Sequence, residues 1–365
     1  MRFASRTSVF ILVVFCVLSL HREVRASCGA ISCFVVIGAQ QQIPQQGVLT
    51  VNGIYNFTPM RLLSGTTGII PAADQARQRL ILDHHQEVRT ITQIYTLDLN
   101  YGVTDRLAVE FTLPYLKRKH QHIDGLGESA TEAGEPVNFS DNGIGDMRVT
   151  AKYNVLPTLR HNVVMGFGLE LPTGDTRARD SSGQVLESAG QLGRGNVGLI
   201  GSIYQTYELI PHRLSQFSFA SYRHTFRNRD GYQFGDEYQV NVGLSLVTTP
   251  WLVLTNQLNY RYLTHDNVTG SLEQSAAPLA GEEPTVIDPR VLDRRVPNTG
   301  STYFAYTPGF QLDLGQLVKS QFAEATSMYF MAQIPLARDS NNNLAQGTSF
   351  VFGFTRSFQL VKPRG

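Results

Sequence analysis

Four histidines are the residues of this chain whose type and spacing could most directly do chemistry. His84 and His85 follow Asp83, and His120 and His122 are separated by one residue. Imidazole nitrogens bind zinc, copper and nickel, so the two pairs could share a metal if the segments that carry them met. Sequence spacing does not establish such a meeting, because metal geometry depends on the fold. We therefore interpret these side chains as solvated loop histidines and predict no metal site and no cofactor.

Two further motifs are found in enzymes but lack the required context here. The segment Gly193–Gly198 has the G-x-G-x-x-G spacing of a dinucleotide site, which needs a following helix whose N-terminus faces the pyrophosphate. Residues 199–209 have the pattern of a strand instead, so we interpret the glycines as a flexible connection into that strand. A hydrolase would need a serine activated by a histidine such as His224, but neither H-E-x-x-H nor G-x-S-x-G occurs. We therefore predict no enzyme and keep a barrel-borne hydrolase as an alternative.

The N-terminus predicts export. Arg2 and Arg6 precede an apolar stretch, Ser8–Leu20, and Val24–Ala26 supplies a small-residue cleavage pattern. The apolar stretch is too short to span a membrane comfortably. Residues 1–26 are therefore predicted to be a signal peptide.

Two cysteines, Cys28 and Cys33, remain if Cys16 leaves with the signal. An oxidising exported setting favours a disulfide between two thiols that lie so close in sequence. A metal site at these cysteines is the alternative, but two thiols fall short of the four ligands usual for structural zinc. The Gln-rich residues 40–46 that follow are typical of a linker.

The composition argues against several classes of protein. The 365 residues include 31 Lys and Arg against 30 Asp and Glu, so no basic surface for nucleic acid is expected. A mean hydropathy of −0.13 argues against a polytopic helical membrane protein. It is compatible with a membrane β-barrel, whose strands mix lipid-facing apolar and lumen-facing polar side chains.

Twelve segments alternate between apolar and polar residues, which is typical of strands with one apolar and one polar face. In the third segment, for example, Val109 belongs to the apolar face and Glu110 to the polar face. The seventh segment is ambiguous, because Phe217 and Tyr222 favour opposite phases. The segments are 48–58, 87–101, 106–116, 146–155, 162–172, 195–209, 214–226, 238–246, 252–262, 302–314, 327–337 and 348–360.

The connections between these segments alternate in length. The even-numbered connections are mostly tight turns, with 315–326 as the exception. Long and short connections at opposite ends are the layout of an outer-membrane barrel, with long loops outside and short turns in the periplasm. An even number of strands places both ends of the barrel on the periplasmic side. The long connections are 59–86, 117–142, 173–194, 227–235, 263–299 and 338–347.

A soluble β-sandwich is the alternative architecture. The predicted strands have about ten residues or more, close to what a tilted membrane strand needs and above the roughly five or six typical of soluble sheets. Inside a membrane only a closed sheet pairs every backbone group. We therefore predict an all-β fold, an antiparallel transmembrane β-barrel of twelve strands over residues 48–360, followed by a tail at 361–365. The Cys/Gln-rich residues 27–47 either enter the lumen as a plug or stay in the periplasm, and the sequence does not choose.

The segment Gly143–Tyr153, which begins G-I-G-D and ends in K-Y, resembles a recurring pattern of the outer-membrane family named after the meta-pathway of phenol degradation. Leu171–Asp175 (L-P-T-G-D) is similar to a second signature of that family. The resemblance covers residues 48–360 and implies a barrel that passes small solutes, aromatic or hydrophobic ones among them. It implies no catalytic residues. One departure is that such barrels usually end on an aromatic residue that the insertion machinery recognises, whereas a tail follows Phe358.

The predicted function is passive passage of small solutes through a polar, mixed-charge lumen in the cell outer membrane of a Gram-negative bacterium. The alternatives are a structural sleeve for a partner protein and the hydrolase named above. Charged residues on the polar strand faces are predicted to line the path, because a hydrated lumen tolerates charges that a lipid face does not. The predicted pore-lining residues are Glu110, Asp146, Arg148, Lys152, Glu170 and Arg261.

The predicted partners are the lipid bilayer and its lipopolysaccharide, the small solute and the outer-membrane insertion machinery, with no nucleic acid. The basic run Lys117–Lys119 could bind lipopolysaccharide phosphates or anionic solutes. It could equally belong to a solvated loop, because residues 117–142 also carry several acidic side chains.

Overall fold

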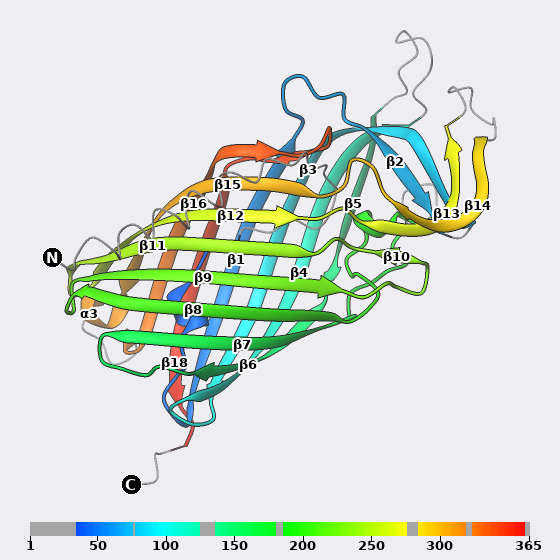
Figure 1. Cartoon of the computed structure of the whole chain (residues 1–365). Helices are drawn as coiled ribbons and strands as arrows, with labels where there is room; N and C mark the ends of the chain where they lie inside the picture. The colour runs from blue at the N-terminus through cyan, green and yellow to red at the C-terminus, as the bar shows by residue number, and fades with distance from the viewer. Residues whose placement is uncertain are drawn as a thin grey trace, which may run out of the picture.

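A closed ring of antiparallel strands makes up most of the molecule (Figure 1). The computed structural model describes residues 34–75, 77–124, 136–179, 185–275, 284–318 and 323–361. The ring closes because its first strand, β1 (Val48–Arg61), pairs on one side with β3 (Arg79–Gly102) and on the other with the last strand, β18 (Ser349–Gln359). The predicted signal peptide at 1–26 and the predicted Cys28–Cys33 disulfide lie outside the described residues.

Within the described part of the chain, twelve strands form the ring, and each overlaps one of the twelve predicted segments. The prediction of a twelve-stranded antiparallel barrel is therefore confirmed. Besides β1, β3 and β18, the ring contains β4 (Leu107–Asp124), β6 (Met147–Asn154), β7 (His161–Leu171), β8 (Gly198–Ile210), β9 (Leu214–Thr225), β11 (Glu237–Thr249), β12 (Leu252–Leu263), β15 (Ser301–Asp313) and β16 (Thr326–Asp339).

Short elements supplement the ring. The helical ones are α2 (Gly38–Gln41), the 3₁₀ turn η1 (Ser188–Gly190) and α3 (Leu314–Val318), and no described helix is long and apolar enough to cross a membrane. The additional strands are β2 (Ile69–Asp74), β5 (Pro136–Ile144), β10 (Tyr232–Gln233), β13 (Asn267–Gln274), β14 (Thr285–Arg295) and β17 (Ala345–Gln346).

The two faces of the ring differ as the alternation predicts. Val109 and Leu244 point outward and are 39% and 45% exposed, whereas Glu110 and Asn241 point inward and are 9% and 1% exposed. Successive strand residues point to opposite faces, so an apolar exterior and a polar interior follow from a period of two. The outer surface is the lipid-facing band of a membrane barrel.

The strands continue beyond this band at the end that carries the long connections. β4 runs on to Asp124 and pairs there with β5, and β13 pairs with β14 (Figure 1). The prediction of plain loops at 117–142 and 263–299 was therefore wrong. Outside the membrane both faces of a strand contact water, so these extensions need no apolar alternation and escape a search for period two.

Candidate functional site

A cavity of about 290 Å³ lies inside the barrel. All six predicted pore-lining residues, Glu110, Asp146, Arg148, Lys152, Glu170 and Arg261, contribute to its wall. Two stretches of chain that do not belong to the ring also line it. These are the N-terminal segment (residues 34–41) and the inward loop (residues 188–194), which belongs to the connection between β7 and β8.

The N-terminal segment lies in the interior, where one amide side chain binds its backbone. Gln257 on β12 accepts a hydrogen bond from the backbone N–H of Val36 (2.9 Å) and donates one to its carbonyl (2.9 Å). This pairing satisfies a buried peptide group much as a neighbouring strand would. Of the two placements that the sequence left open for residues 27–47, residues 34–41 occupy the lumen.

Apolar contacts hold the same segment against the wall. Val36 packs with Val164, Tyr204 and Phe217, three inward side chains of adjacent strands. The ambiguity of β9 is thereby explained. Phe217 points inward and is 5% exposed because it contacts this segment, and Tyr222 points outward.

Charged side chains surround the segment as well. Lys152 Nζ lies 2.8 Å from Glu110 Oε1 and also donates to the carbonyl of Gln40. The guanidinium of Arg261 lies over the ring of Phe34, 4.6 Å from its centroid. These contacts place three of the predicted lining residues, on β4, β6 and β12, around a single stretch of chain.

The inward loop is fixed by polar contacts. Arg118 on β4 donates to the carbonyls of Ala189 (3.3 Å) and Gly190 (2.8 Å). Arg118 is 4% exposed and points inward, so it is unavailable for lipopolysaccharide, and the interpretation of this basic run as a solvated loop was also wrong. Lys117 and Lys119, its neighbours in sequence, are exposed.

Asp146, at the start of β6, joins the two sequence signatures to this loop. Its carboxylate accepts hydrogen bonds from the backbone N–H groups of Gly174 (2.9 Å) and Arg194 (2.7 Å). The backbones approach so closely that a Cβ on Gly174 would lie 2.6 Å from the Cα of Gly193. Gly193 therefore serves close packing, and the interpretation of these glycines as a flexible connection was wrong, whereas a strand, β8, follows from Gly198 as predicted.

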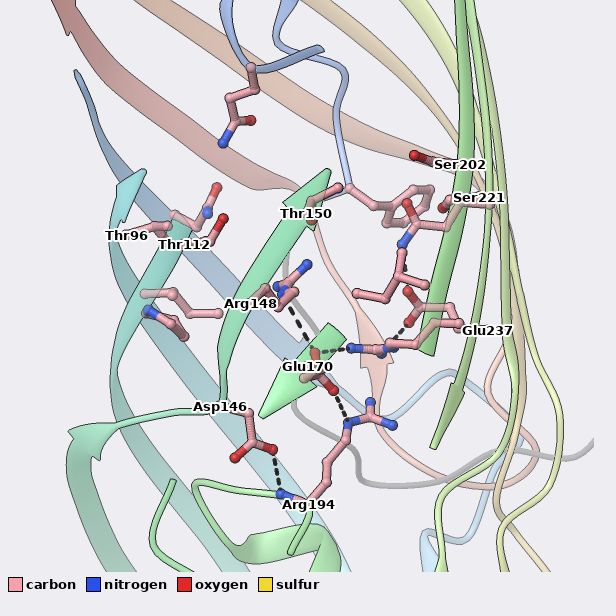
Figure 2. A pocket seen from close by; sticks show the side chains of 18 of the residues that line it. Thr96, Thr112, Asp146, Arg148, Thr150, Glu170, Arg194, Ser202, Ser221 and Glu237 are labelled. Carbon is pink, nitrogen blue, oxygen red and sulfur yellow. Dashed lines mark hydrogen bonds and ion pairs between the residues drawn. The ribbon is translucent and has the colours of Figure 1, made fainter. Parts of the chain in front are cut away.

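Glu170 on β7 lies at the centre of an ionic network (Figure 2). Its carboxylate oxygens are 3.5 Å from Arg148 Nε, 3.6 Å from Arg194 Nε and 3.3 Å from Arg223 Nη1. Arg223 also binds Glu237 at 2.9 Å. Glu170 is almost fully buried, whereas the side chain of Arg148 is 41% exposed and presents its charge to the cavity.

Two lining arginines were not among the predicted residues. Arg223 belongs to the ambiguous strand β9, and an inward assignment of Phe217 would have turned Arg223 inward too, because both occupy odd positions. Arg194 is in the inward loop, where no periodicity exists to show which way a side chain points. The nearby glycines gave no indication of it either, because they were interpreted as a flexible connection.

The four histidines lie at the long-connection end of the barrel. His84 and His85 are on β3, His120 and His122 are on β4, and the rings of His85 and His122 lie 5.1 Å apart. His85 is 7% exposed. The interpretation of these residues as solvated loop histidines was therefore wrong, because both pairs belong to strand extensions that the alternation did not reveal.

A closed antiparallel ring with an apolar outside and a polar, partly filled inside defines an outer-membrane β-barrel. The chain belongs to the family described as "Putative MetA-pathway of phenol degradation", whose sequence profile matches residues 82–281. No curated protein matches the sequence significantly.

Solved structures place the fold in the same class. The COG4313 outer membrane channel from Pseudomonas putida F1 is similar with a TM-score of 0.55 and 14% identity, over 89% of this chain and 100% of that one. The Ralstonia pickettii toluene transporter TbuX has a TM-score of 0.38 and 12% identity, over 86% and 90% of the two chains. At 14% identity the likeness to the COG4313 channel concerns the barrel fold alone.

Proposed function

We propose that the chain is a passive outer-membrane channel whose solutes pass through the cavity inside the barrel. The observation that carries this proposal is the cavity itself, enclosed by strands whose outer faces are apolar and lined by all six charged residues predicted from the sequence. The wall carries five basic and four acidic side chains, so it is polar without a dominant sign. No part of this mechanism requires an energy source or a covalent step.

Small aromatic or hydrophobic molecules are the solutes that fit best. Phe34, Phe219 and Phe234 line the cavity together with the charged groups, which gives an aromatic ring apolar surfaces to contact. A volume of about 290 Å³ is at the lower end of ligand-sized pockets, which run from about 300 to 1,000 Å³. The phenol-degradation description of the family agrees with this class of solute.

The geometry around His224 gives the alternative hydrolase no positive support. Its Nδ1 lies 2.7 Å from Asp236 Oδ1, which would orient a catalytic imidazole. Among the described residues, however, no serine hydroxyl forms a hydrogen bond with His224, and Tyr222 occupies the other oxygen of Asp236 at 2.8 Å.

A pair of neighbouring residues tests the proposed path. Ser202 lines the cavity (Figure 2), whereas Ile203, the next residue on β8, faces outward and is 44% exposed. In planar bilayers the wild-type protein should give stepwise conductance. Ser202→Trp should reduce the step several-fold because the indole fills the cavity, and Ile203→Trp should leave it unchanged.

Two outcomes would count against the proposal. A correctly folded barrel that never conducts would favour a structural sleeve. Equal conductance of both tryptophan variants would mean that ions and solutes do not pass through this cavity.

A further inference from the structure

Two adjacent histidines of β3 and a glutamate from another part of the chain converge outside the membrane band. One potential ligand atom from each of His84, His85 and Glu187 lies within 4.8 Å of the other two. Nδ1 of His84 is 3.1 Å from Nδ1 of His85, which in turn is 3.8 Å from Glu187 Oε1. Glu187 directly precedes the inward loop.

A local irregularity brings the two histidines together. Consecutive residues of a regular strand point to opposite faces, so His84 and His85 should diverge. The pairing of β2 with β3 is irregular here, since Ile70 opposes His85 while Ala72 opposes Ile81. Asp83 adopts a left-handed conformation with φ 49°. Such a bulge re-aims side chains, and both imidazoles consequently face the same point.

The spacing of the three donors suits a transition-metal ion. Atoms about 2.0–2.2 Å from a tetrahedral Zn²⁺ lie about 3.3–3.6 Å from one another. The 3.1 Å and 3.8 Å separations bracket that value, and the third pair, His84 and Glu187, lies within 4.8 Å, so side-chain rotations would have to close the set around an ion. Two imidazoles and one carboxylate form a donor set typical of zinc, and they leave the fourth position for water.

A buried carboxylate completes the arrangement around His85. Glu87 is 2% exposed, and its Oε1 lies 3.4 Å from His85 Nε2. A proton on Nε2 directed at Glu87 leaves Nδ1 with its lone pair, on the side of His84 and Glu187. Metal-binding histidines are commonly oriented in this way, by a carboxylate on the ring nitrogen opposite the metal.

We propose that His84, His85 and Glu187 form a binding site for a divalent transition-metal ion, with Zn²⁺ as its probe, and that the bound ion holds the inward loop against β3. Glu187 is joined to Ser188, the first residue of that loop, and Ser188 and Ala189 line the cavity. An ion bound to the two histidines of β3 and to Glu187 therefore holds the inward loop, which bounds the cavity, against the barrel wall.

The site lies beyond the lipid-facing band. Arg89 on β3 and Lys117 on β4 point outward and are exposed, and the outward tyrosines Tyr95 and Tyr115 lie further towards the membrane. Aromatic residues mark the membrane boundary in such barrels. Glu187 keeps 33% of its side chain exposed, so ions in the surrounding solution can reach it.

Calorimetric titration of the tag-free, folded barrel in detergent with Zn²⁺ tests the binding step. The wild type should bind one equivalent. His85→Ala and Glu187→Gln should each weaken binding by about 100-fold, and Glu87→Gln by about 10–100-fold because it orients His85. His212→Asn, at an exposed turn whose φ of 57° asparagine tolerates, is the matched control and should bind as the wild type does.

Absence of binding to the wild type, or equal affinity of Glu187→Gln, would overturn the site. Because Glu187 is in a connection outside the ring, Glu187→Gln keeps the test valid even if His85→Ala does not fold. Heat-modified migration on a gel reports whether each barrel is folded.

Amide hydrogen exchange tests whether the ion holds the loop. Zn²⁺ should slow exchange at Ala189 and Leu192 in the wild type and leave Glu187→Gln unaffected, and equal exchange with and without Zn²⁺ would overturn this step. We expect Zn²⁺ to change the conductance as well only if the proposed channel function is also correct. Slowed exchange with an unchanged current would keep the metal site and count instead against passage beside this loop.

Discussion

The N-terminal segment and the inward loop both narrow the barrel interior, but charged side chains bind the backbone of the loop at more points than that of the segment. Val36 and Ile37 of the segment are buried against inward apolar side chains of the barrel. The loop is held by Asp146 and Arg118 through hydrogen bonds that involve a charged group. Burial of an aliphatic side chain contributes about 1.5–3 kcal/mol, and a hydrogen bond to a charged group about the same.

The segment and the loop differ in how many of their contacts depend on a single side chain of the barrel. Apolar packing of the segment is spread over neighbours from several strands, so no one of them is decisive. The loop buries Leu192 against Ile94 and Leu116, but much of its backbone is bound by two charged side chains, Arg118 and Asp146, each of which makes more than one hydrogen bond. A single substitution should therefore release the loop more readily than the segment.

Asp146→Ala should have the largest effect. It removes both hydrogen bonds to the backbone of Gly174 and Arg194, for a loss of about 3 kcal/mol or more in the free energy of opening the loop. Hydrogen exchange at these two amides should accelerate by at least two orders of magnitude, and the channel current should rise or become noisier. Asp146→Asn, which retains an oxygen acceptor, should lie between alanine and the wild type. Unchanged protection in Asp146→Ala would show that the other contacts of the loop hold it without this carboxylate.

Gln257→Leu should have a smaller effect on the N-terminal segment. It removes two hydrogen bonds between neutral groups, for a loss of about 1–3 kcal/mol in total in the free energy of releasing the segment, while the apolar contacts remain. Exchange at Val36 should accelerate without loss of the folded barrel. The outward neighbour Asn256 provides the control, because Asn256→Leu should leave exchange at Val36 unchanged. If Gln257→Leu released the segment as completely as Asp146→Ala releases the loop, the segment would be no harder to release by a single substitution than the loop.

The outer surface of this barrel was predictable because one solvent acts on it throughout. Lipid requires an apolar residue at every second position, so Val109 and Leu244 could be assigned without knowledge of any other strand. The charged residues opposite them, such as Glu110, then had to face the interior. All six predicted lining residues were obtained by this argument and all six contact the same cavity.

The inward-facing residues were less predictable because some of them contact other segments of the chain and not water. Tyr329 on β16 and Phe217 on β9 point inward against residues 34–41, and their apolar character weakened the alternation of the two strands. The convergence of His84 with Glu187 depends on a bulge and on a connection that no periodicity describes. The alternation of apolar and polar residues shows whether a strand face contacts lipid or water. It does not show whether another segment of the chain packs against that face.

Arg148→Ala should have the smallest effect on stability and a distinct effect on selectivity. Arg148 is 41% exposed, and Glu170 keeps Arg194 and Arg223 as partners, so the loss should be below about 1 kcal/mol. Removing a positive charge from the cavity should shift the reversal potential in a salt gradient towards cation selectivity. Arg290→Ala, in an exposed strand outside the ring, removes the same charge away from the cavity and should leave selectivity unchanged. A shift of equal size in both variants would mean that the selectivity reflects the overall charge of the protein, and that the ions do not pass close to the network around Glu170.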